Sequence, residues 1–169
     1  YAAMLRAVNV GGRKLAMADL KAVIAGLGWD DPQTLLASGN AVVATDRAAA
    51  TVEAEVKAAL AAELGLATEV FVRDHAELAA AMAGNPFQAF AAAQPSKMMV
   101  VFLGDEAPED LSWLTRWASA GEEAAAGPRC LYITYPEGSG RSKLANARGG
   151  PVGTARNWNT VGKLAEMTA

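Results

Sequence analysis

The sequence predicts an α+β protein built as tandem ferredoxin-like α/β plaits, two lobes with the element order strand, helix, strand, strand, helix, strand. Three observations predict it. Apolar and periodic segments follow this order in residues 1–74, the order recurs in residues 97–169, and a proline-containing segment lies between them. A chain of 169 residues is long enough for one domain or two small lobes with a buried core.

The first lobe opens with a mostly apolar segment, residues 1–10, which predicts a buried strand that ends at a Gly-Gly turn. Apolar residues then recur at helical spacing over residues 17–27, with Gly28 as the expected C-cap. The stretch "TLLASGNAVVAT" has Ser38, Gly39 and Asn40 between two β-prone runs, which predicts a hairpin.

A long helix is predicted over residues 52–64, because apolar residues mark one face and Gly65 follows. "TEVFVRD" then supplies the fourth strand and completes the first lobe. A short helix is expected from Asp74, as its N-cap, to Met82, before a connecting segment broken by two prolines.

The second lobe repeats this order with weaker boundaries. Its expected elements are a strand "KMMVVFL", a helix over 111–117, a hairpin of "EEAAA" and "RCLYITY" around Gly127 and Pro128, a short helix "SKLANA", a strand "TARNW" and a helix over 160–167. The predicted domains are therefore a first lobe at 1–74, a helix and linker at 75–96, and a second lobe at 97–169.

Charge is unevenly distributed along the chain, whose net charge is −3. Residues 1–128 hold 9 Lys+Arg and 16 Asp+Glu, whereas residues 129–169 hold 6 and 2. A net acidic protein is a poor candidate for non-specific nucleic-acid binding, so a nucleic-acid partner is disfavoured, although a local basic site for a small anion or an RNA end stays open.

No apolar run approaches the ~20 residues of a membrane span, and no secretion signal is visible, so a cytoplasmic location without a membrane partner is expected. The oligomeric state is not indicated by the sequence.

The most distinctive chemical motif is "PEGSGRSKLANARGG", residues 136–150. Gly138 and Gly140 allow the backbone to turn, and Arg141, Ser142 and Lys143 follow where a helix is expected to begin, an arrangement typical of an anion site. The spacing is not that of a P-loop, because Lys143 is followed by leucine. The alternative is that the two cations are simply solvated and a serine caps the helix.

Two further motifs carry candidate binding residues. In "TARNWNTVGK", Arg156 can bind a carboxylate or phosphate with two hydrogen bonds, next to Asn157 and Trp158, or the three can form a structural cluster. In "RAVNVGG", Arg6 and Asn9 lie at the first strand and its exit. The charged Arg6 either faces a partner or a cleft, or forms a buried ion pair. We expect Arg141, Ser142, Lys143 and Arg156 to converge on one anion.

The sequence contains few candidate catalytic residues. His75 is the only histidine and is expected to be exposed at a helix start, and Cys130 is expected to be a buried, reduced thiol. No cluster has metal-ligand spacing, so no metal or cofactor is expected. Two functions stay open: a module that binds a phosphorylated or carboxylated ligand, a nucleotide or an RNA segment, and a small transferase or hydrolase whose cations stabilise a transferring anionic group.

Five stretches, "LRAVNVGG", "SGNAVV", "NPF", "YPEGSGRSKL" and "TARNWNTVGKL", occur in the order found in domain of unknown function 1697, so the chain resembles that family over nearly its whole length. The resemblance implies tandem α/β plaits in a small soluble bacterial protein, and it implies no activity. Ala7 and Ser139 depart from the family pattern, where a glycine and a larger apolar residue are expected.

Overall fold

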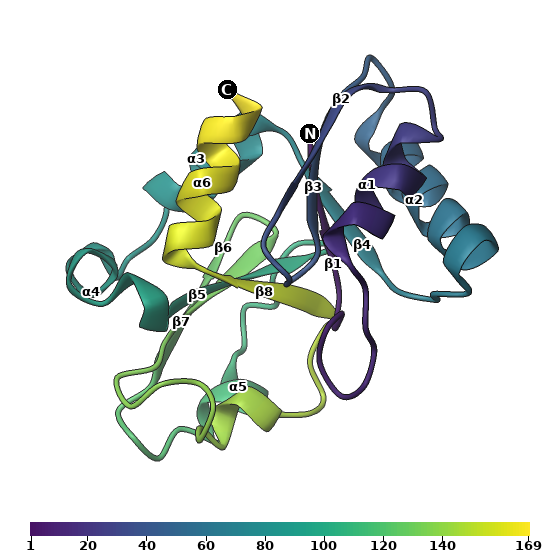
Figure 1. Ribbon diagram of the computed structural model, residues 1–169. Coiled ribbons are helices and arrows are strands. Elements are labelled where there is room, and N and C mark those ends of the chain that lie inside the picture. Colours follow the sequence, from purple (N-terminus) through teal and green to yellow (C-terminus); the bar gives the residue numbers. More distant parts are fainter. The chain divides into compact units, whose positions relative to one another are not determined.

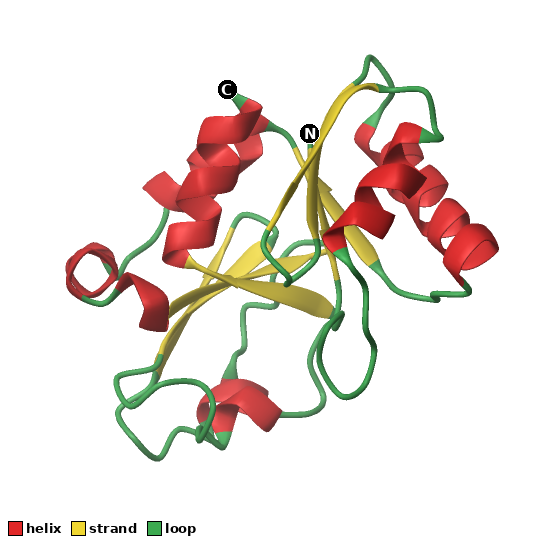
Figure 2. Ribbon diagram, viewed as in Figure 1, coloured by secondary structure: helices red, strands yellow, loops and turns green.

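The computed structural model describes residues 1–169 as a mixed α+β protein with two four-stranded antiparallel sheets and six helices (Figures 1 and 2). The chain divides into two compact units. Unit 1 contains Tyr1–Leu78 and Leu164–Ala169, and unit 2 contains Ala79–Lys163. None of the helices is both long and apolar enough to cross a membrane.

Unit 1 is a four-stranded sheet with two helices against one face (Figure 1). Its elements are β1 (Ala2–Leu5), α1 (Met17–Ala25), β2 (Asp30–Leu35), β3 (Asn40–Ala44), α2 (Ala49–Leu64) and β4 (Val70–Arg73). The strand order is β2-β3-β1-β4, with every neighbouring pair antiparallel. Leu20 of α1 and Val56 of α2, both fully buried, pack in one cluster with Leu5 of β1, so the periodic apolar positions do form the core.

Two predicted boundaries in unit 1 are wrong. The strand expected over residues 1–10 ends at Leu5, because Ala7 and Asn9 adopt positive φ angles of 53° and 55° and turn the chain. Helix α1 ends two residues earlier than expected, with Gly26 rather than Gly28 at its C-cap. Gly65 does close α2 in the left-handed conformation, as the sequence indicates.

A third helix, α3 (His75–Ala83), begins in unit 1 and continues into unit 2. The Asp74 carboxylate accepts a hydrogen bond from the Glu77 N–H at 2.8 Å, and the Glu77 carboxylate accepts one from the Asp74 N–H at 3.0 Å. This reciprocal pair is a capping box, and it confirms Asp74 as the N-cap.

Unit 2 repeats the strand order of unit 1. Its remaining elements are α4 (Gln88–Ala93), the 3₁₀ turn η1 (Pro95–Lys97), β5 (Met98–Leu103), α5 (Ser112–Thr115), β6 (Glu123–Gly127), β7 (Cys130–Thr134), the 3₁₀ turn η2 (Leu144–Asn146), β8 (Gly153–Asn157) and the first part of α6 (Trp158–Thr168). From Leu164 on, α6 belongs to unit 1. The sheet order is β6-β7-β5-β8, again antiparallel throughout. The helix expected over 111–117 is a single turn, and "SKLANA" forms only the three-residue η2.

The two faces of the unit 2 sheet carry different side chains. Leu131 and Ile133 of β7 pack in a cluster with Leu114 of α5 and Leu144 of η2. Because side chains alternate along a strand, Tyr132 between them lies on the opposite face. This alternation decides which candidate site residues can meet.

Tyr132 is fully buried, and its hydroxyl donates a 2.7 Å hydrogen bond to the carbonyl of Ala81 in the last turn of α3. Burial raises the pKa of this hydroxyl, so it stays protonated and keeps donating. We expect Tyr132→Phe to lower the free energy of unfolding by about 1–2 kcal/mol, because a buried carbonyl loses its donor. Urea denaturation measures the loss. Tyr135→Phe is the control: that hydroxyl makes no hydrogen bond within the protein, and an equal loss there would contradict the prediction.

Candidate functional site

The segment Pro136–Gly150 lies in the connection between β7 and β8 and is called the basic loop here. Arg141, Lys143 and Arg148 are exposed on it, and none of the three side chains makes a hydrogen bond or ion pair within the protein. Glu137 is the last acidic residue before Glu166. Glu137 itself lies in the loop, so the loop presents three cations and one carboxylate to solvent and has a net positive charge.

Three contacts fix the basic loop on unit 2. Leu144 is 1% exposed within the Leu131 and Ile133 cluster. The buried Ser142 hydroxyl donates to the Glu122 carboxylate at 2.7 Å and accepts from the Leu144 N–H at 3.2 Å. Near the end of the loop, Gly150 lies so close to the Trp113 ring that a Cβ at this position would be 2.1 Å from a ring carbon. The cations thus project from an anchored segment.

Glu122, the residue before β6, supports the loop by accepting three hydrogen bonds. Besides the Ser142 hydroxyl, the N–H groups of Ser119 and Ala120 donate to it at 2.9 Å and 2.7 Å. These bonds, that of Ser142 above all, lower the pKa of the Glu122 carboxyl from 4.5 to about 2. The carboxylate is therefore ionised at neutral pH and is a weak base.

Backbone donors accompany the cations. Gly138 has φ 83°, and its N–H donates to the Tyr135 carbonyl, while the Ser142 N–H donates to Ser139. The N–H groups of Gly140, Arg141 and Lys143 donate to no protein acceptor. The expected helix N-terminus is absent, because η2 has only three residues and supplies no helix dipole of consequence.

Arg156 lies elsewhere in unit 2. It is 5% exposed, and its Nη1 donates to the Thr154 hydroxyl at 2.7 Å and the Ala155 carbonyl at 2.8 Å. Burial lowers its pKa to about 10, so it is still charged at neutral pH. In the sheet, Val100 of β5 is paired with Arg156 on one side and with Tyr132 on the other, so the Arg156 and Tyr132 side chains share a face. Leu144 packs on the opposite face. The structure therefore does not bring Arg156 together with the anchor of the basic loop.

Asn157 and Trp158 occupy the start of α6. The Asn157 side-chain oxygen accepts from the N–H and hydroxyl of Thr160, at 3.0 Å and 3.1 Å. These contacts make Asn157 the N-cap of α6. Trp158, half-buried, is the first residue of that helix.

The candidate residues of unit 1 have separate roles. Arg6 is exposed directly after β1, which contradicts the buried ion pair considered for it. Asn9 donates to the carbonyls of Leu15 and Ala37, at 2.9 Å and 2.6 Å, and accepts from the Leu15 N–H at 2.8 Å. Asn9 thus holds the β1–α1 loop against the hairpin.

Two other expectations hold. His75 is exposed at the first position of α3, and Cys130 is a buried, free thiol. No group of three or more His, Cys, Asp or Glu side chains is arranged to hold a metal ion.

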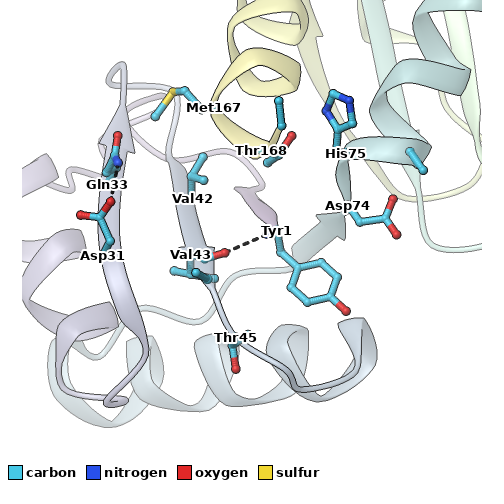
Figure 3. Close-up of a pocket in the computed structure, with 13 residues that line it drawn as sticks. Tyr1, Asp31, Gln33, Val42, Val43, Thr45, Asp74, His75, Met167 and Thr168 are labelled. Atoms are coloured by element: carbon cyan, nitrogen blue, oxygen red, sulfur yellow. Dashed lines mark hydrogen bonds between the residues drawn. The ribbon is translucent and has the colours of Figure 1, made fainter.

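A cavity in unit 1 was not predicted (Figure 3). It has a volume of about 610 Å³. Its polar lining includes Asp31, Gln33, Thr45, Asp74, His75 and Thr168. These residues come from β2, the position after β3, the N-cap and first residue of α3, and the end of α6, so no local motif in the sequence could have indicated the cavity.

Comparison with known proteins places this α+β chain in a family. Its residues 1–132 match the family described as "Protein of unknown function (DUF1697)", and the chain belongs to that family. The matched residues end before the basic loop. The structure is similar to "conserved bacterial protein SP0830 from Streptococcus pneumoniae", with a TM-score of 0.76 and 18% sequence identity over 99% of this chain and 96% of that chain, a likeness of fold. No curated protein matches.

Proposed function

We propose that the protein is a ligand-binding protein that holds a phosphorylated or carboxylated small molecule on the basic loop. The observation that carries this proposal is the pair of exposed, unpartnered cations Arg141 and Lys143 on an anchored loop. Neighbouring backbone N–H groups add hydrogen-bond donors for oxygen atoms of an anion. A nucleotide or the end of an RNA chain carries the same chemistry.

The architecture behind this proposal is a tandem of ferredoxin-like plaits, divided at 1–74, 75–96 and 97–169. The support is that both sheets place their strands in the same order, with the first and third strands of each unit in the centre. In unit 2 the crossover that is a helix in unit 1 is replaced by the basic loop with η2. Long connections of this kind often carry function.

Binding is favoured over transfer or hydrolysis. An enzyme of that kind needs a general base within hydrogen-bond reach of the bound group. Glu122 is the carboxylate that is hydrogen-bonded to the loop from outside it, and a pKa of about 2 leaves it little basicity near neutral pH. Its partner Ser142 is buried and donates to it, which does not activate the hydroxyl as a nucleophile.

We expect Arg141→Ala and Lys143→Ala each to weaken binding of inorganic phosphate or AMP about tenfold, since each removes a charge-assisted hydrogen bond. Thermal unfolding without ligand should be nearly unchanged, because both side chains are exposed. Isothermal titration calorimetry measures the affinities.

Arg116→Ala is the matched control, because Arg116 is another exposed cation of unit 2, 5.9 Å from the Trp117 ring. Its affinity should equal that of wild type. Equal losses in all three variants would indicate only non-specific attraction, and full affinity in the loop variants would refute the proposed site.

A further inference from the structure

The cavity in unit 1 is bordered by β2 and β3 on one side and by the start of α3 and the end of α6 on the other (Figure 3). Asp31 and Gln33 lie on the β2 side, and His75 and Thr168 lie across from them, with Val42 between the two groups (Figure 3). The hydrogen bonds that these four side chains already make determine what they can offer a ligand.

His75 and Thr168 both present acceptors. The His75 Nδ1 lies 2.9 Å from the Ala165 carbonyl oxygen. A carbonyl only accepts, so in the neutral ring Nδ1 carries the proton and Nε2 keeps a lone pair. The Thr168 hydroxyl donates to the carbonyls of Leu164 and Ala165, at 2.9 Å and 3.2 Å, which leaves its oxygen as an acceptor.

Asp31 and Gln33 add acceptors on the opposite side. The Gln33 side-chain amide donates to Asp31 Oδ2 at 2.9 Å, which leaves Asp31 Oδ1 and Gln33 Oε1 as acceptors. Asp31 has a φ of 44° at an irregularity in the β2–β3 pairing. Such irregularities redirect side chains from the regular alternation of a strand.

The lining of the cavity also carries negative charge and apolar surface, both of which suit an organic cation. Asp31 and Asp74 line it, whereas no lysine or arginine does. The backbone nitrogen of Tyr1 donates to the Val43 carbonyl at 2.8 Å. Val42 and Met167 supply apolar surface beside the polar groups.

We propose that this cavity binds an organic cation rich in hydrogen-bond donors, an alkyl guanidinium or alkyl amine. Its charged head lies against Asp31 and Gln33, its carbon chain contacts Val42, and its remaining donors reach His75 Nε2. This cation is either a free small molecule or the side chain of an arginine or lysine in a peptide, because both carry a guanidinium or ammonium group on an alkyl chain. The site is in unit 1 and does not depend on the function proposed for the basic loop.

The test is isothermal titration calorimetry with agmatine, with an acetylated and amidated arginine peptide, and with glutarate as an anion of similar length. We expect agmatine or the peptide to bind and glutarate not to bind. Asp31→Asn should weaken binding roughly fivefold, the value of an exposed ion pair. Asparagine tolerates positive φ, so this variant is expected to fold.

Asp30→Asn is the matched control, because Asp30 is an exposed carboxylate next to Asp31 that does not line the cavity. His75→Asn keeps a donor for the Ala165 carbonyl and removes Nε2, so it should also weaken binding. Peptide binding without agmatine binding would assign the cation to a side chain of a protein partner. No binding of either cation at millimolar concentration, or equal losses in Asp30→Asn and Asp31→Asn, would overturn the proposal.

Discussion

Gly39→Ala is expected to destabilise the protein by about 2–4 kcal/mol, through backbone strain and a steric overlap in the core. Gly39 has a φ of 85° in the β2–β3 hairpin. A Cβ at this position would lie 2.4 Å from Val8 Cγ2 and 3.1 Å from Leu5 Cβ. Both neighbours are buried, and the Leu5 N–H donates to the Gly39 carbonyl at 2.8 Å, so neither can move away cheaply.

Gly65→Ala separates the two causes. Gly65 also has a positive φ, 60°, but nothing lies within 4 Å of the position of its Cβ. This variant should lose only about 1 kcal/mol, the cost of the left-handed conformation. The measurement is the urea midpoint at constant m-value. Equal losses for Gly39→Ala and Gly65→Ala would show that the overlap in the hairpin relaxes.

Apart from the C-cap of α1, turns and caps were predictable because few residues determine them. The hairpin at Gly39, the cap at Gly65, the turn at Gly127 and the capping box from Asp74 to Glu77 all follow from local backbone chemistry. The early end of β1 was not predictable in this way. Asn9 holds its left-handed conformation through hydrogen bonds that reach Ala37 in the hairpin.

The candidate site was predictable only in part, for a related reason. The exposure of Arg141 and Lys143 follows from the composition of the basic loop. The anchor of the loop depends on Glu122, 20 residues before Ser142. The position of Arg156 depends on its register with Val100, which fixes the face of the sheet that it occupies. No pattern within either motif contains this information.

Glu122→Gln is expected to lower the free energy of unfolding at pH 7 by about 2 kcal/mol, because the side chain loses its charge and one of its two acceptor oxygens becomes an NH2 group, which cannot accept a hydrogen bond. The affected donors are the Ser142 hydroxyl and the N–H groups of Ser119 and Ala120. Glutamine is nearly isosteric with glutamate, so the packing of the 8% exposed side chain is retained. The loss therefore reports the ionised carboxylate with its two acceptor oxygens, and not a change in side-chain volume.

The pH dependence of stability identifies the same carboxylate. Because folding lowers the Glu122 pKa from 4.5 to about 2, its stabilising effect is fully present above pH 4.5 and is lost as the pH falls toward 2. Urea denaturation of wild type and Glu122→Gln at pH 7, 5, 4 and 3 should show a constant difference at the first two values and a shrinking one below. Glu123→Gln, at the exposed neighbour on β6, should follow wild type at every pH. A difference between wild type and Glu122→Gln that persists undiminished at pH 3 would mean that shape, rather than charge, holds Ser142 and the basic loop in place.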